Sequence, residues 1–262
     1  MPPSSTSPFL RERVLLAVTL VVAVALAWAY LVWMATDMAV ANGVTLAHCA
    51  AMPGMTSSSA AYVGWIFVMW SVMGVAMMLP TAFPLVLLFR RFWRARHATS
   101  TALGPALELA GGYVVAWVAF GLVAALLQWG LEHAELVTPA LGELRQPRIG
   151  GAVLLCAGLF QLTPLKAACL SRCRSPLMFL NTRWREGRPG PFLMGLDHGL
   201  FCLGCCWALM LVMFVAGAMN LLWMAALTVL MLAEKCLPHG RELGWLAGIA
   251  LLVAGAWLVF AA

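Results

Sequence analysis

Long apolar runs separated by short polar segments dominate the pattern of this chain. A bilayer core of roughly 30 Å needs about 20 apolar residues in a helix. Runs close to that length recur at residues 14–35, 61–88, 103–131, 149–165, 192–216, 221–233 and 243–260. This pattern predicts an all-α, polytopic membrane helix bundle of about seven transmembrane helices. Residues 221–233 form the shortest run and could join the preceding one through GAMN, which leaves six helices as the alternative.

The composition agrees with this pattern. Hydrophobic residues make up 63% of the 262 residues, charged residues make up 10%, and the mean hydropathy is +0.93. These values are too apolar for a soluble domain of this length. Residues 1–262 are therefore predicted to form a single integral membrane domain. Its polar parts are a cytoplasmic tail at 1–13, an extracytoplasmic loop at 37–60, and basic cytoplasmic loops at 89–102 and 166–191.

The basic residues predict the orientation of the helices. The segment RER at residues 11–13 precedes a long apolar run without an obvious cleavage site, so the first helix is expected to be retained. Lys and Arg resist translocation and stay in the cytoplasm. Seven helices with the N-terminus inside place every Lys and Arg inside except Arg145 and Arg148, so Lys166 and Lys235 are assigned to cytoplasmic segments. Topology thus explains the net charge of +6, and no nucleic acid partner is expected.

A group of soft metal ligands lies in the apolar run that contains HGLFCLGCCW. At 100° per residue, six donors fall within an arc of about 120° on one helix face. We call this set the donor stripe: Met194, His198, Cys202, Cys205, Cys206 and Met213. Thiolates, thioethers and imidazole suit Cu(I) and zinc. Cysteine also packs well as a small apolar residue, but the combination favours a metal-binding role.

The segment CLSRC contains a second pair of thiols, Cys169 and Cys173. Pro164 is expected to end or kink the fourth helix just before it. The i, i+4 spacing places both thiols on one face of a short interfacial helix, and two neighbouring arginines favour the thiolate form. We expect this pair to lie at the depth of the donor stripe and to complete a shared metal site. The alternative is a pair of interfacial packing residues.

Methionines add a third group of soft donors. Met69, Met73 and Met77 recur at i, i+4 and i+8 in the second apolar run, which predicts a ladder of thioethers and a possible metal path. Methionine is also a common gap filler in helices. The outward loop before this run contains HCAAMPGM, a possible capture site or simply a mobile loop, with the donors His48, Cys49, Met52 and Met55.

Two carboxylates lie close to the soft ligands in sequence. Glu234 ends the sixth apolar run, and Asp197 directly precedes His198. Ionisable groups near a membrane interior are functional candidates, and either carboxylate could orient the imidazole of His198 from the second shell. The alternative for both is an interfacial anchor whose carboxylate reaches water.

These blocks resemble a known family. Four segments are similar to the motifs of an uncharacterised bacterial family described as predicted metal-binding integral membrane proteins. They are LFQLTPLKAACLSRCRSPLMFL, MGLDHGLFCLGCCWALML, GAMNLLWMAAL with the following EK, and MWSVMGVAMMLP. The resemblance runs from about Tyr62 to Lys235 and leaves out the HCAAMPGM loop. It implies a multi-pass protein of the bacterial inner (cytoplasmic) membrane. The matching motif positions imply the ligands Cys169, Cys173, His198, Cys202, Cys205 and Cys206.

Three classes of function agree with these residues. We favour a protein that binds a soft metal, Cu(I) in the first place, and acts in uptake, delivery or storage with a copper chaperone or copper enzyme as partner. A membrane thiol oxidoreductase and a structural or assembly subunit with a stabilising zinc are the alternatives. Nothing in the chain resembles a P-loop, a catalytic serine motif or an ATPase phosphorylation site, so any transport is expected to be passive or coupled to an ion or a partner. We expect a protein that is not an enzyme. Thioethers on the outside and thiols near the cytoplasm predict inward movement or loading of Cu(I).

Overall fold

The computed structural model describes residues 7–44, 60–97, 101–138 and 142–261. These residues confirm the all-α prediction, because the only pairing outside helices in the described chain is an isolated bridge between Val137 and Leu144. The helices are α1 (Ser7–Val44), α2 (Ala60–Arg96), α3 (Leu103–His133), α4 (Pro147–Leu162), α5 (Pro164–Arg174), α6 (Pro176–Arg183), α7 (Gly190–Leu211), α8 (Met213–Ala216), α9 (Leu221–Cys236) and α10 (Gly240–Phe260).

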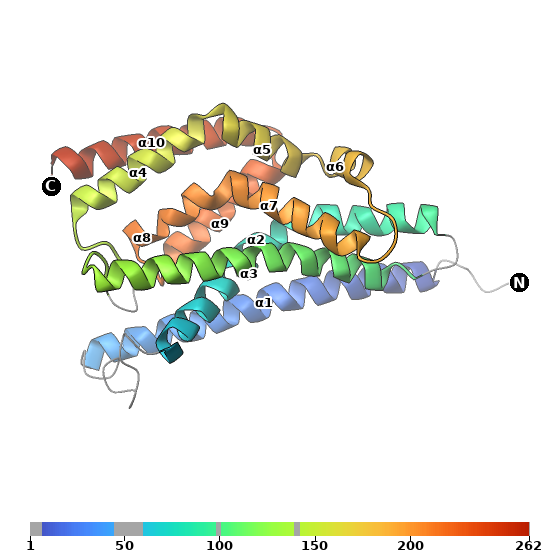
Figure 1. Ribbon diagram of the computed structural model, residues 1–262, viewed down its shortest axis with the longest axis horizontal. Helices are drawn as coiled ribbons and strands as arrows, with labels where there is room; N and C mark the ends of the chain where they lie inside the picture. The colour runs from blue at the N-terminus through green and yellow to red at the C-terminus, as the bar shows by residue number, and fades with distance from the viewer. Residues whose placement is uncertain (1–6, 45–59, 98–100, 139–141, 262) are drawn as a thin grey trace, which may run out of the picture.

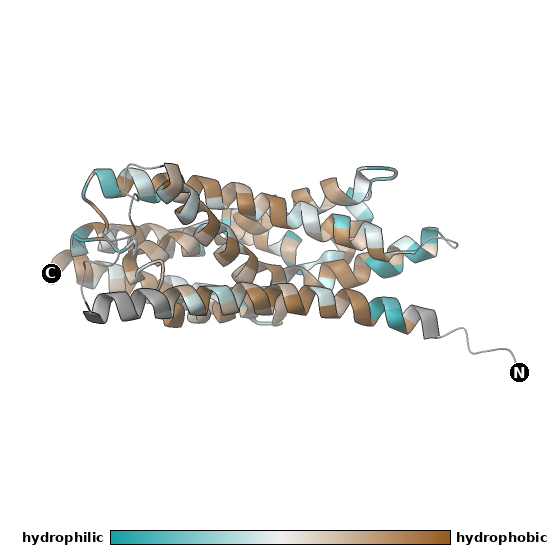
Figure 2. Ribbon diagram, turned by 90° about the horizontal axis from the view of Figure 1, so that it is seen from below, coloured by the Kyte–Doolittle hydropathy of each residue, from teal (hydrophilic) through white to brown (hydrophobic). Residues whose placement is uncertain are grey.

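The long helices lie side by side along a common direction, and the start of α1 and the end of α10 lie at opposite ends of the bundle (Figure 1). Apolar residues dominate the middle of the bundle, and polar residues gather toward its two ends (Figure 2). We call the end where α2 finishes the basic end, because it carries Arg90, Arg91, Arg94 and Arg96. This distribution is the one expected for helices that cross an apolar layer.

Five helical segments are long and apolar enough to cross a membrane: Leu10–Thr36, Ala60–Arg96, Leu103–His133, Gly190–Ala216 and Gly240–Phe260. The pair α4 and α5 makes a sixth candidate, with a bend of 63° between the two helices. The shortest predicted run forms a separate helix, α9, and does not merge with the helix before it. With 16 residues, α9 is about 24 Å long, which is shorter than a bilayer core of roughly 30 Å.

The bend between α4 and α5 follows from its sequence. Pro164 has no backbone N–H and starts α5 at its first turn, where no donor is needed. The hydroxyl oxygen of Thr163 caps this helix by accepting a hydrogen bond from the backbone N–H of Lys166 at 3.3 Å. The predicted break at Pro164 is therefore confirmed, and it turns α5 against α7.

Glycines allow the closest helix contacts in the bundle. A Cβ atom on Gly112 of α3 would overlap the carbonyl oxygen of Phe192 in α7, and one on Gly195 of α7 would overlap the carbonyl oxygen of Leu109 in α3. The helices α4 and α10 meet in the same way at two further pairs of glycines. Small residues are the usual means by which apolar helices approach closely without a hydrophobic driving force. The α3–α7 contact matters most here because α7 carries the donor stripe.

We therefore expect Gly112→Ala to weaken the α3–α7 contact and to lower the thermal unfolding temperature in detergent. The expected cost is about 1–3 kcal/mol, because an added methyl group forces packed backbones apart. Gly111→Ala is the matched control, since a Cβ at Gly111 meets no atom within 4 Å. Alanine is the better helix former, so the control should be neutral or up to about 1 kcal/mol more stable. Equal unfolding temperatures for the two variants would contradict this description of the interface.

Candidate metal centre

Helix α7 turns its donor stripe into the bundle. The side chains of His198, Cys202, Cys205 and Cys206 are all buried, with exposed fractions between 0% and 3%. Met194 and, at the start of α8, Met213 extend the stripe toward the two ends and are fully buried. The side chains of the donor stripe therefore face protein and not lipid. This position agrees with a role in packing and also with a role in metal binding.

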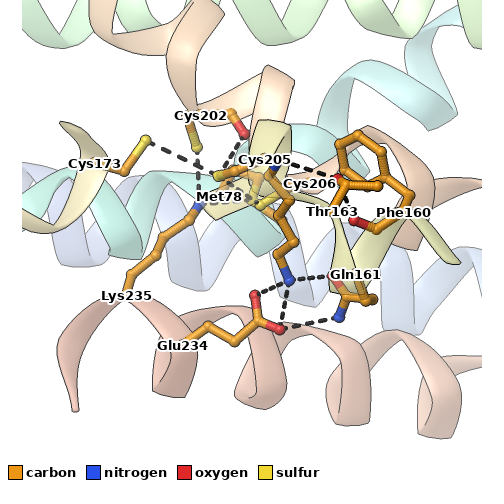
Figure 3. Close-up of polar contacts among 11 residues, drawn as sticks. Met78, Phe160, Gln161, Thr163, Cys173, Cys202, Cys205, Cys206, Glu234 and Lys235 are labelled. Atoms are coloured by element: carbon orange, nitrogen blue, oxygen red, sulfur yellow. Dashed lines mark hydrogen bonds and ion pairs between the residues drawn. The ribbon is translucent and has the colours of Figure 1, made fainter. Parts of the chain in front are cut away.

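Four free thiols from two helices form what we call the thiol cluster: Cys173, Cys202, Cys205 and Cys206. The Sγ atom of Cys205 lies 3.5 Å from that of Cys206 and 4.0 Å from that of Cys173 (Figure 3). The thiol of Cys205 also donates a hydrogen bond to the backbone oxygen of Cys202 at 3.1 Å. The bend at Pro164 creates this cluster, because it brings Cys173 of α5 onto α7.

A buried lysine closes one side of the thiol cluster. The Nζ atom of Lys235 lies 2.8 Å from Sγ of Cys202 and 3.7 Å from Sδ of Met78 (Figure 3). The same Nζ atom lies 3.4 Å from the hydroxyl oxygen of Thr81. The Tyr113 hydroxyl lies 2.9 Å from the same Cys202 sulfur. A buried ammonium needs a negative partner, and no described carboxylate pairs with Lys235. A thiolate at Cys202 would supply that charge.

A buried ion pair lies beside this contact. The carboxylate of Glu234 is fully buried and accepts hydrogen bonds from Nζ of Lys166, at 2.7 Å from each oxygen, and from the side-chain amide of Gln161 at 3.0 Å (Figure 3). Nζ of Lys166 also donates to the side-chain oxygen of Gln161. Glu234 thus neither reaches water as an anchor nor contacts His198. Lys166 and Lys235, which the sequence assigned to cytoplasmic segments, are buried in the bundle.

Two predicted ligands lie apart from the thiol cluster. The ring of His198 packs between those of Phe179 and Tyr113, at centroid distances of 5.1 and 5.9 Å, and within the described chain its Nδ1 atom has no hydrogen-bond partner. Cys169 is half-buried and its Sγ faces the backbone of α7 at Gly204. The structure therefore brings one thiol of the CLSRC pair to the cluster and packs the other against the flank of α7.

The second predicted partner of the imidazole is engaged elsewhere. Asp197 accepts a hydrogen bond from the guanidinium of Arg185 at 2.9 Å, in an ion pair that is partly open to solvent. Neither predicted second-shell carboxylate therefore contacts His198. Within the described residues, the contacts of the imidazole are the ring packing against Phe179 and Tyr113.

The methionine ladder of α2 is inside the protein. Met69, Met73 and Met77 are all fully buried, so they face protein and not lipid, which both a metal path and gap filling allow. Among the methionines whose side chains the structure describes, Met178 is the one that is exposed. The predicted capture loop, with His48, Cys49, Met52 and Met55, lies outside the described residues.

The cluster is not a preformed metal site. Within the described chain, no three side chains from His, Cys, Asp and Glu are already arranged around a common point where a metal ion would fit. The contacts explain why: the Cys205 thiol is turned toward a backbone oxygen, and Lys235 occupies the side of Cys202 that a cation would take. A metal bound by these thiols would require a rotation at Cys205 and a displacement of the Lys235 ammonium.

The sequence contained a hint of the missed residues. Glu234 and Lys235 are consecutive charges at the end of an apolar helix, and consecutive helical residues point about 100° apart. Two such charges cannot both face one interface, so at least one had to find a partner inside the bundle. Tyr113, Thr81 and Met78 gave no such hint, because they reach the cluster only through long-range packing of α2 and α3.

The fold and the site define an all-α bundle with five or six candidate membrane spans around a buried cluster of thiols. Residues 67–258 match the model of the PpoB2 family, which is described as a copper chaperone. The match covers more than half of the chain, so the protein belongs to this family. No curated protein and no solved structure matches the chain. The sequence resemblance indicated metal-binding proteins in general, and the family match specifies a copper-related family.

Proposed function

We propose that this protein is a membrane-embedded copper chaperone that holds Cu(I) at the thiol cluster and delivers it to another copper protein. The observation that carries the proposal is the convergence of Cys173, Cys205 and Cys206 from two helices in a family described as copper chaperones. Thiolates are the protein ligands that Cu(I) prefers. Copper is the cargo here, so the site needs to hold and release it without catalysing a reaction.

The distances in the cluster suit a shared metal. Metal–sulfur bonds near 2.3 Å, the value for zinc, allow two sulfurs on one ion to lie up to about 4.6 Å apart. The separations of Cys205 from Cys206 and from Cys173, 3.5 and 4.0 Å, both fall within that limit. Rotation of the Cys205 side chain away from its backbone acceptor would free its sulfur. Copper binding then needs this rotation, the withdrawal of Lys235 from Cys202 and the release of a proton from each thiol that becomes a ligand.

Lys235 gives the metal-free site its positive charge. An ammonium and a Cu(I) ion each carry a single positive charge, so exchanging one for the other at a Cys202 thiolate leaves the charge there unchanged, while each further thiol that binds Cu(I) releases a proton. The lysine side chain is long and flexible, and its charged head can withdraw while its stem stays packed. We propose that Cu(I) enters as Lys235 moves off Cys202, and that the return of Lys235 favours release to a partner.

The route to the cluster is proposed to run along α2. With the bundle in a membrane and its basic end in the cytoplasm, Met69, Met73 and Met77 lie between the outer face and the thiols. Thioethers bind copper without losing a proton and tolerate an oxidising exterior better than thiols. Met213 and the loop with His48, Cys49, Met52 and Met55 belong to the same proposed route. Affinity then rises inward, which favours uptake or loading.

Replacement of cluster thiols should remove most of the bound copper. We expect Cys205→Ser or Cys202→Ser to lower the copper retained by anaerobically purified protein after a challenge with a Cu(I) chelator, because serine is a hard and poor ligand for Cu(I). Copper per chain is measured by mass spectrometry of the digested protein. Cys156→Ser is the matched control, since Cys156 is an exposed free thiol outside the cluster.

The same measurement separates the alternatives. Full copper retention in Cys205→Ser would show that the cluster packs the bundle and does not bind the metal. Zinc in place of copper in the unsubstituted protein would support a structural role. Protein without any metal, whose thiols oxidise and reduce reversibly, would support an oxidoreductase.

Removal of the competing ammonium should slow copper release. Lys235→Leu is expected to retain copper about tenfold longer against the chelator, a change of about 1.4 kcal/mol, because no internal cation competes for Cys202. Arg241→Leu removes one positive charge from the exposed first turn of α10 and serves as the control. Copper loss at the same rate from Lys235→Leu and from the control would contradict the exchange of Lys235 for Cu(I).

A further inference from the structure

A cavity of about 260 Å³ lies between α5, α6 and α7, away from the thiol cluster. Its wall combines two arginines, two hydroxyl groups and apolar side chains, among them Arg172, Arg183, Ser175, Thr182, Met178 and Phe201. Figure 1 shows α6 beside the start of α7, on the side of the basic end. The proposed handling of copper makes no use of this cavity.

The two arginines of the cavity point at one aromatic ring. The guanidinium carbon of Arg172 lies 4.6 Å from the ring centroid of Phe201, and that of Arg183 lies 5.6 Å from it. Neither arginine forms an ion pair with a carboxylate in the part of the chain that the structure describes. Two guanidinium groups held together repel each other unless an anion lies between them. Their planar forks of donors match the oxygens of a phosphate.

The border of the cavity is apolar on one side and polar on the other. Leu177, Met178 and Leu200 have exposed fractions of 55%, 66% and 54%. Asn181 and Thr182, a few residues along α6, are exposed polar residues. An exposed apolar surface that adjoins a pair of cations and a polar edge has the chemistry of the boundary between acyl chains and headgroups.

We propose that this cavity binds an anionic phospholipid, with its headgroup phosphate between Arg172 and Arg183 and an acyl chain along Leu177 and Met178. The charge of the two guanidinium groups selects a lipid with a net negative headgroup over a zwitterionic one. The apolar border selects a lipid over a free anion or an acidic protein segment, which would leave Leu177 and Met178 uncovered.

The lipid site adjoins the metal centre without forming part of it. Phe179 lines the cavity and also packs edge-on against the ring of His198 at 5.1 Å. Arg172 directly precedes Cys173 on α5. A bound lipid would hold α5 and α6 against α7 and thereby fix the helix that supplies Cys173. Lipid binding itself does not depend on copper, so the two proposals can fail separately.

The test is native mass spectrometry of the full chain in detergent with an equimolar mixture of phosphatidylglycerol and phosphatidylcholine. We expect phosphatidylglycerol adducts to dominate, and Arg172→Gln with Arg183→Gln to lower their abundance about tenfold. Arg145→Gln with Arg148→Gln is the matched control, because it removes the same charge from exposed residues in the α3–α4 connection and at the start of α4. The control should bind phosphatidylglycerol as the unsubstituted protein does.

Several results would overturn the lipid site. Equal binding of phosphatidylglycerol by the double variant and the control would exclude recognition of the lipid by these arginines. Binding of phosphatidylglycerol no better than that of phosphatidylcholine would exclude it as well. Displacement of phosphatidylglycerol by excess inorganic phosphate would identify a free-anion site, and displacement by an acidic peptide would identify a protein docking site. Circular dichroism checks the fold of each variant, and the single substitutions Arg172→Gln and Arg183→Gln replace the double variant if it does not purify.

Discussion

The centre of this protein depends on the contact between the ammonium of Lys235 and the sulfur of Cys202, 2.8 Å apart in an apolar interior. An unpaired charge at such a place would cost several kcal/mol. The neighbouring carboxylate of Glu234 cannot serve as its partner, because Lys166 already holds it at 2.7 Å. Two consecutive residues of α9 therefore form two separate pairs. One ties α9 to α4 and α5, and the other ties it to α7.

On the proposed function, this arrangement would allow a cluster of thiols to stay without metal inside an apolar bundle. Thiolates without a nearby cation would become protonated. A Cys202 thiolate paired with Lys235 would stabilise the metal-free site, and the ammonium could be exchanged for an ion of equal charge. Met78 of α2 places a further soft donor beside the same contact, with its Sδ atom 3.7 Å from Nζ of Lys235.

Local features of the sequence predicted what depends on local geometry. The helical period placed the donor stripe of α7 on one face, and the missing N–H of Pro164 predicted the bend that brings α5 to α7. Spacing alone could not show which thiol of the CLSRC pair would meet the cluster, because the rotation of α5 is set by its packing. Lys235 was read as a topology residue for the same reason: its partners Cys202, Thr81 and Met78 lie on other helices. The apolar run of α9 could not show by itself whether this helix spans a membrane, because a helix of 16 residues can also lie within the bundle.

X-ray absorption at the copper edge tests the central claim most directly, because it reports the atoms bound to the metal. The full chain is loaded anaerobically with one equivalent of Cu(I) and compared with Cys156→Ser as the control for a thiol outside the cluster. The account predicts a first shell of sulfur neighbours for both proteins, with a second-shell contribution from nearby protein atoms. A first shell made of nitrogen or oxygen would contradict it, since no arrangement of Cys173, Cys205 and Cys206 around copper could produce that spectrum.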